Sequence, residues 1–264
     1  MSLLDRLFEI VPWLSYLGSI VLLLAAAEVG HRVGTARRQR GETRTSEIST
    51  LESATLGLLA LMIGFTFAVS LNRYDARRTL VLDEANAIGT TALRARLLPA
   101  PHAAEVLGLL REYVRIRVDL IGRSQRPAIL RAAIDRSNAL QERLWQQAMA
   151  VTAADSHSIT AGLFVQALND MIDLQEKRVV AAGNHAPAAV FVLLYGIAMA
   201  AVGFTGYSGA LDDPRRRIPS LVAVLLIATV IGLVGDIDRP ASGFVAISQK
   251  PMLDLMASLS SKGP

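Results

Sequence analysis

Four apolar stretches of this sequence are each long enough to cross a lipid bilayer. A hydrocarbon core about 30 Å thick takes roughly 20 residues of α-helix. A backbone surrounded by lipid must satisfy its own hydrogen bonds, so apolar segments of this length cross as helices. The sequence therefore predicts four transmembrane helices, at residues 10–28, 53–72, 186–211 and 218–235.

The composition indicates a polar part of the chain in addition to these spans. Hydrophobic residues make up 52% of the 264 residues and charged residues 19%, which is too apolar for a soluble domain and too charged for a bare membrane bundle. Residues 73–185 lack an apolar run of membrane length, and their apolar residues recur at helical spacing. We therefore expect an all-α integral membrane protein with four transmembrane helices and a helical module between the second and third spans.

The remaining segments connect or flank these parts. Residues 1–9 are an N-terminal segment, and residues 29–52 and 212–217 are loops rich in arginine. In the C-terminal tail, residues 236–264, a short amphipathic helix either lies on the membrane interface or packs on the module. The two arginine-rich loops and the segments flanking the module carry nearly equal numbers of basic residues. By a small margin, the positive-inside rule favours placing the loops in the cytoplasm and the module outside it.

Catalytic and cofactor chemistry has no support in the sequence. The chain has no cysteine, and its four histidines do not form ligand pairs on one helix, so we expect no metal site. Phosphate-binding loops, dinucleotide fingerprints and nucleophile elbows do not occur. The net charge of +4 comes without an aromatic-basic nucleic-acid motif. We therefore expect neither an enzyme nor a cofactor, and no nucleic-acid partner.

The second span is expected to continue as one helix to about residue 98, because no Gly or Pro lies between Phe65 and Ile88. Three- and four-residue spacing along it predicts a packed seam that Arg78 interrupts, with Asp75 as the local partner of Arg78. The predicted seam consists of Leu71, Tyr74, Arg78, Val81, Ala85, Ile88, Ala92 and Ala95.

Other charges on this helix have no opposite charge one turn away, so they must be satisfied elsewhere. These charges are Arg73, Arg77, Asp83 and Glu84. They either face solvent or pair with other helices, or Arg73 and Arg77 form a ring of positive charge at the mouth of a pore in a symmetric oligomer. Asp236 and Asp238, near the end of the fourth span, are further candidates for charge pairs between helices or subunits.

Phe65, Thr66 and Ser70 in the second span have two interpretations. Small or weakly polar residues in a membrane helix usually mark close helix packing. Beside aromatic residues, they also build hydrophobic constrictions that gate a pore. They are therefore candidates for a pore or gate.

Three stretches of the chain carry a family resemblance: "GFTFAVSLNRYDARRTLVLDEANAIGTTALRARLLP" (64–99), "LLREYV" (109–114) and "DIDRPASGFVAISQKPMLDL" (236–255). They resemble the bacterial bestrophin-like membrane proteins, a domain family of unknown function. The resemblance covers essentially the whole chain and keeps the same order of spans and module. This family is distantly similar to bestrophins, which are pentameric anion channels with the second helix lining the pore and a cytosolic helical region.

The resemblance implies a homo-oligomer in the lipid bilayer of the cell (inner) membrane, with chloride or other small anions as its ions. It also implies a cytoplasmic module, against the charge count, so both orientations stay open. A recognisable acidic Ca²⁺ clasp does not occur in the sequence. We predict an oligomeric, bestrophin-like ion channel that conducts anions, with the second span at its axis. The alternative is a four-span sensor or scaffold whose helical module binds a partner or small ligand.

Overall fold

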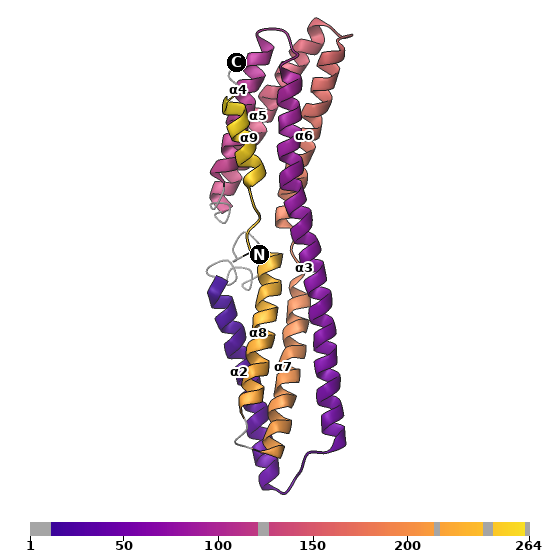
Figure 1. Cartoon of the computed structure of the whole chain (residues 1–264), viewed down its shortest axis with the longest axis vertical. Helices are drawn as coiled ribbons and strands as arrows, with labels where there is room; N and C mark the ends of the chain where they lie inside the picture. The colour runs from indigo at the N-terminus through magenta and orange to yellow at the C-terminus, as the bar shows by residue number, and fades with distance from the viewer. Residues whose placement is uncertain (1–11, 121–126, 214–216, 240–244, 262–264) are drawn as a thin grey trace. The chain divides into compact units, whose positions relative to one another are not determined.

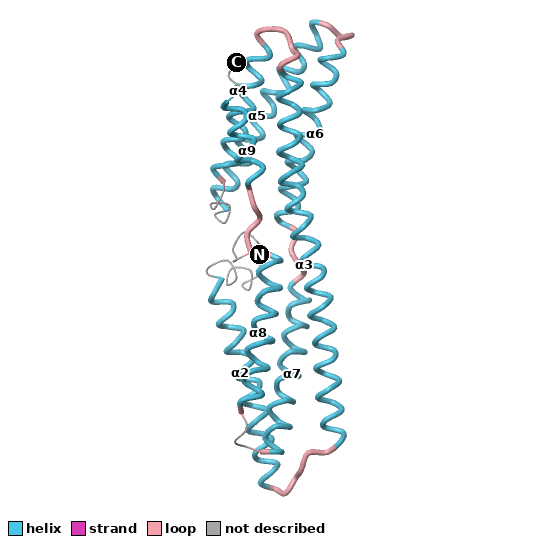
Figure 2. The backbone as a smooth tube through the Cα atoms, viewed as in Figure 1, coloured by secondary structure: helices cyan, strands magenta, loops and turns pink. Residues whose placement is uncertain are grey.

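The computed structural model describes residues 12–120, 127–213, 217–239 and 245–261. Figure 2 shows helices and loops in these residues and no strand. Four helical stretches are long and apolar enough to cross a membrane, at Tyr16–Gln39, Ser46–Ala95, Ile159–Asp212 and Ile218–Asp238, and the predicted all-α fold is confirmed. The helices are α2 (Pro12–Gln39), α3 (Ser46–Ala95), α4 (His102–Asp119), α5 (Pro127–Ala154), α6 (Ile159–Gly183), α7 (Ala188–Asp212), α8 (Ile218–Asp238) and α9 (Lys250–Ser261).

The chain divides into two compact units. The spanning unit comprises Met1–Arg73 and His185–Val245, and the module comprises Tyr74–Asn184 and Ala246–Pro264. Helix α3 contributes to both, because it continues as one helix of 50 residues (Figure 1).

The spanning unit is built around a close contact between α2 and α7. A Cβ atom at Gly30 would overlap the backbone carbonyl of Gly203, and a Cβ atom at Gly206 would overlap the carbonyl oxygen of Ala27. Lipid tails are as apolar as leucine, so helices in a bilayer associate through van der Waals packing, which such small residues permit. The glycines therefore set the separation of the two helices.

Apolar side chains complete the interior of the spanning unit. Leu23 of α2, Leu194 of α7 and Ile231 of α8 are almost fully buried in one cluster. Leu59 of α3 belongs to the same cluster. The first part of α3 is therefore anchored to these helices by one side only.

The module has its own apolar core. Ile88 of α3, Leu110 of α4, Leu144 of α5 and Phe164 of α6 are fully buried there. Helix α9 adds Met252, which is also fully buried, so the C-terminal helix packs on the module. The module and the spanning unit therefore each have an apolar core of their own.

The glycine contact yields a first prediction. We expect Gly30→Val to destabilise the protein in detergent by about 1–3 kcal/mol, because overpacking forces α2 away from α7. The control is Gly18→Val on the same helix, where an added Cβ meets no atom within 4 Å. Thermal unfolding of both variants measures the effect, and equal losses of stability would contradict the close contact.

Candidate functional site on helix α3

Helix α3 has one buried side that runs along its length. At about 100° per residue, positions three, four or seven residues apart return to the same face of a helix. We call this face the inner stripe: Leu59, Thr66, Ser70, Arg77, Val81, Glu84, Ile88, Thr91 and Ala95, all buried. Its polar and charged members must be satisfied by other groups of the chain, since burial without partners is costly.

The predicted seam is confirmed from Val81 onward and wrong at Leu71 and Arg78, whereas Tyr74 is partly buried. Val81, Ala85, Ile88, Ala92 and Ala95 are all buried. Leu71 and Arg78, in contrast, are exposed, and Arg77 takes the buried position in place of Arg78. The predicted pairing of Arg78 was also wrong, because the described side chains of Arg78 and Asp75 form no ion pair with each other.

Arg77 lies on the inner stripe because the end of α6 offers it acceptors. Its side chain is only 6% exposed. Its Nε donates to the carbonyl oxygen of Ala181 at 3.0 Å, and its Nη2 donates to that of Asn184 at 2.7 Å. The last carbonyls of a helix have no partner within the helix and carry partial negative charge. Arg77 therefore caps the carboxyl end of α6.

Arg73 is held within the spanning unit by a buried acid. Its Nη1 lies 3.2 Å from Oδ1 of Asp238, a residue of α8 that is fully buried. The Asp238 carboxylate also accepts from the backbone N–H of Ala186, at 3.0 Å and 3.2 Å for its two oxygens. The neighbouring acid Asp236 accepts from the backbone N–H of Val245 at 2.9 Å. Asp238 thus ties the end of α8 to α3 and to the segment that leads into α7.

Glu84 is the most enclosed charge of the module, with none of its surface exposed. Its Oε1 accepts from Nε of Arg117 on α4 at 2.8 Å. Its Oε2 accepts from Nη1 of Arg178 on α6. Two guanidinium groups from different helices therefore meet one carboxylate, and the three helices are joined at a single point.

Neutral groups surround this charge centre. The hydroxyl of Tyr113 donates to Oε1 of Gln175 at 2.6 Å and lies 3.2 Å from Oε1 of Glu84. Burial, together with the negative charge of Glu84, raises the pKa of Tyr113, so the phenol stays protonated. Gln175 also accepts from Nε2 of Gln141 at 3.0 Å, and Arg178 donates to Gln249 at 2.7 Å. The centre therefore connects to α5 and to the segment before α9.

Thr66 and Ser70, two of the pore candidates, also lie on the inner stripe. The hydroxyl of Thr66 donates to the carbonyl oxygens of Met62 and Ile63 in its own helix, at 2.7 Å and 3.0 Å. Ser70 is 1% exposed. Both side chains face the packed interior of the spanning unit.

The opposite side of α3 is uncovered by the rest of the chain. We call it the outer stripe: Gly57, Leu61, Phe65, Ala68, Asn72, Asp75, Thr79, Asp83, Asn86, Thr90 and Leu93. All of these residues are exposed except Asp83, which is partly exposed. Phe65, with 62% of its surface exposed, is the largest of them. Leu226 on α8 and Val192 on α7 are as exposed as Phe65, as is usual for side chains that face lipid, so the exposure of Phe65 is not by itself distinctive.

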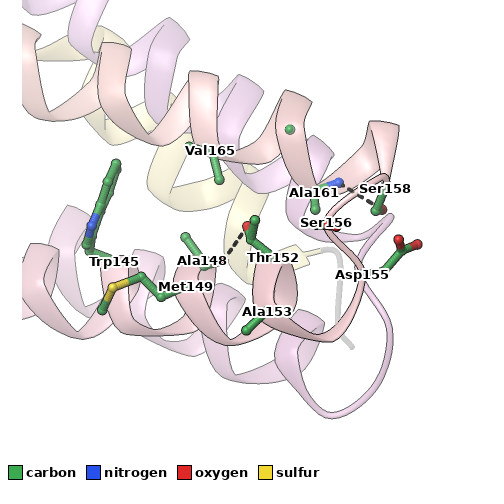
Figure 3. Close-up of a pocket in the computed structure, with 11 residues that line it drawn as sticks. Trp145, Ala148, Met149, Thr152, Ala153, Asp155, Ser156, Ser158, Ala161 and Val165 are labelled. Carbon is green, nitrogen blue, oxygen red and sulfur yellow. Dashed lines mark hydrogen bonds between the residues drawn. The ribbon is translucent and has the colours of Figure 1, made fainter.

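A groove of about 480 Å³ lies elsewhere, between the end of α5 and the start of α6. Figure 3 shows Trp145 and Met149 on the α5 side and Val165 on the α6 side. The small residues Ala148 and Ala161 form its floor. Ser158 caps α6 there, accepting from the backbone N–H of Ala161 at 3.3 Å. The lining of the groove is largely apolar, and its polar members are Thr152, Asp155, Ser156 and Ser158.

Sequence reasoning did not identify the partners of Glu84. Arg117 lies three residues after a stretch used for the family resemblance, and Arg178 entered only the charge count, so no local signal linked either to α3. Within the described residues, no group of three or more His, Asp or Glu side chains is placed to hold a metal ion.

Comparisons with known proteins bear on the fold. A family model described as a Bestrophin-like domain matches residues 18–252. Among solved structures, a bacterial bestrophin homologue from Klebsiella pneumoniae shares 17% identity at a TM-score of 0.70, over 94% of this chain and 99% of that chain. A point mutant of that homologue shares 17% identity at a TM-score of 0.69, over 92% and 97% of the two chains. No curated protein matches.

The charge centre yields a second prediction. We expect Glu84→Gln to destabilise the module by about 3–5 kcal/mol, because it leaves the buried Arg117 without its counter-charge. Glu176→Gln, an exposed acid on α6, is the matched control and should have little effect. Thermal unfolding in detergent measures both variants. Adding Arg117→Leu to Glu84→Gln should recover part of the lost stability, because it removes the unpaired cation. No recovery would show that the unpaired Arg117 is not the cause of the loss.

Proposed function

Because the chain belongs to the bestrophin-like family, we propose that it forms an oligomeric ion channel in the cell (inner) membrane, with the outer stripe of α3 lining its axis. The observation that carries this proposal is the outer stripe itself. It runs the length of a helix that begins in the spanning unit, and the rest of the chain leaves it uncovered.

The outer stripe changes from apolar to polar along α3. Gly57, Leu61, Phe65 and Ala68 are apolar, and they lie within the membrane-length part of α3. Asn72, Thr79, Asn86 and Thr90 follow and are polar. A pathway needs a narrow apolar segment for gating and a wettable segment for ion entry. The order of residues along the stripe supports both.

Several copies of the chain are needed to enclose such a pathway. One chain presents the stripe on its surface, whereas a closed ring of identical chains would turn every copy of it toward a common axis. Leu61 and Phe65 from all copies would then form a constriction, which conducts only when it is hydrated. A homo-oligomer is therefore part of the proposal.

The pore candidates from the sequence have different roles in this proposal. Phe65 stays a candidate for the constriction. Thr66 and Ser70 support the helix from its inner stripe, and Arg73 and Arg77 are engaged by groups of their own chain. Anion conduction, which the family resemblance implies, stays a prediction, and these two arginines no longer argue for it.

A second candidate function rests on the groove between α5 and α6. Its apolar lining supports the alternative in which the module binds a small ligand or a partner and the spans serve as an anchor. A ligand bound there without any ion flux would favour this reading.

Reconstitution into liposomes tests the channel. We expect Phe65→Ala to raise the flux of small ions at least about tenfold over the unchanged protein, because a wider and less apolar constriction hydrates more easily. Leu226→Ala on α8 is the matched control, since Leu226 is 63% exposed and Phe65 is 62% exposed.

The same protein preparations also show the oligomeric state. The detergent-solubilised particle should be a symmetric ring of several chains. Vesicles that stay impermeant with both the unchanged protein and Phe65→Ala, or a particle containing one chain, would contradict the proposal.

A further inference from the structure

Two arginines from neighbouring segments meet at one end of the spanning unit. Helices α2 and α8 pack against each other (Figure 1). Tyr16 of α2 lies against Gly232 near the end of α8, whereas Glu28 of α2 meets Arg217 directly before the start of α8. The two helices are therefore antiparallel. Arg32, one turn after Glu28 on α2, bonds to the same carboxylate as Arg217.

This group of three side chains has a surplus of positive charge. Nε of Arg32 lies 2.8 Å from Oε1 of Glu28, and Nη1 of Arg217 lies 3.1 Å from Oε2. Two cations share one anion, so the group as a whole is cationic. A guanidinium carries five N–H donors, and both arginines keep donors for a further acceptor. Their side chains are 77% and 62% exposed, so these donors can be reached from outside the chain.

The two arginines lie at the height of the lipid headgroups. Ala27 ends the uncharged run of α2, and Arg32 follows it by five residues, which is about 7.5 Å along a helix. The headgroup layer extends roughly 5–7 Å beyond each side of the hydrocarbon core. Arg217 directly precedes Ile218, the first residue of the apolar helix α8. Both guanidinium groups therefore reach the layer that contains the lipid phosphates.

Exposed apolar side chains adjoin both arginines. Val29 and Val33 lie on the same side of α2 as Arg32, and Ile218 and Leu221 follow Arg217 on α8. Such exposure is usual for side chains that face lipid, and it gains a specific meaning here from the cationic group beside it. A phospholipid presents a phosphate next to its acyl chains, and its chemistry matches this order of cationic and apolar groups.

We propose that Arg32 and Arg217 bind the phosphate of an anionic phospholipid whose acyl chains lie against α2 and α8. Arginine suits this role because its planar N–H groups can bond two phosphate oxygens at once. The surplus positive charge favours a headgroup of net negative charge, such as phosphatidylglycerol. It disfavours phosphatidylcholine, whose trimethylammonium group would approach the two arginines. The inference requires only that the spanning unit lies in a bilayer, so it does not depend on ion conduction.

Native mass spectrometry of the full chain in detergent tests the inference. The protein is titrated with phosphatidylglycerol, phosphatidylcholine or inorganic phosphate, and the first molecule bound per chain gives the Kd. An arginine near the membrane surface contributes about fivefold to the affinity for an anionic lipid. The unchanged protein should therefore bind phosphatidylglycerol at least about fivefold more tightly than phosphatidylcholine. The double variant Arg32→Gln, Arg217→Gln should weaken the binding of phosphatidylglycerol at least about tenfold.

The double variant Arg136→Gln, Arg143→Gln is the matched control. Both of these arginines are exposed, both lie on α5 of the module, and their replacement removes the same charge. This variant should keep its affinity for phosphatidylglycerol within about twofold of the original, because charges beyond a Debye length are screened. Elution volume and thermal unfolding show whether each variant retains the native particle.

Each possible result decides the inference. An unchanged affinity for phosphatidylglycerol in the Arg32→Gln, Arg217→Gln variant overturns it, and so does equal affinity of the unchanged protein for the two lipids. Inorganic phosphate bound as tightly as phosphatidylglycerol overturns the lipid partner in favour of a free anion. Fewer chains per particle in this variant would assign the two arginines to a contact between copies instead. A loss of phosphatidylglycerol binding in this variant but not in the control supports the lipid site, whether or not the protein conducts ions.

Discussion

The need to neutralise buried charge determines how helix α3 is oriented. Arg77 and Glu84 lie on the same side of the helix as its apolar core residues, and removing one ion from water costs several kcal/mol. Each therefore requires a partner at a definite place: the last carbonyls of α6 for Arg77, and Arg117 and Arg178 for Glu84. A rotation of α3 by one residue, about 100°, would move Arg77 and Glu84 away from all of these partners at once.

The orientation of α3 also decides what the helix shows to its surroundings. With the ionic groups of the inner stripe satisfied, the opposite side is left to residues that contribute little to the stability of the single chain. Phe65 and Asp83 both belong to that side. The proposed constriction is thus a consequence of how α3 is oriented.

The spans and the all-α fold could be predicted because they depend on composition and length, which are local properties. The side of α3 that each charge occupies could not. Arg77 and Arg78 are adjacent, and both fit a three- or four-residue spacing to the apolar residues beyond them. Arg77 is the buried one because its acceptors are at Ala181 and Asn184, more than a hundred residues away in sequence. Partners this distant leave no trace in a local pattern.

The separation of the two stripes has a consequence for how such a protein can change over generations. Substitutions on the outer stripe alter side chains that the fold of one chain does not use, so they escape most of the penalty that core substitutions carry. A single exchange at Phe65 would then change the proposed constriction while the same helices still pack. Lineages with this architecture can thus vary the outer stripe without first becoming more stable.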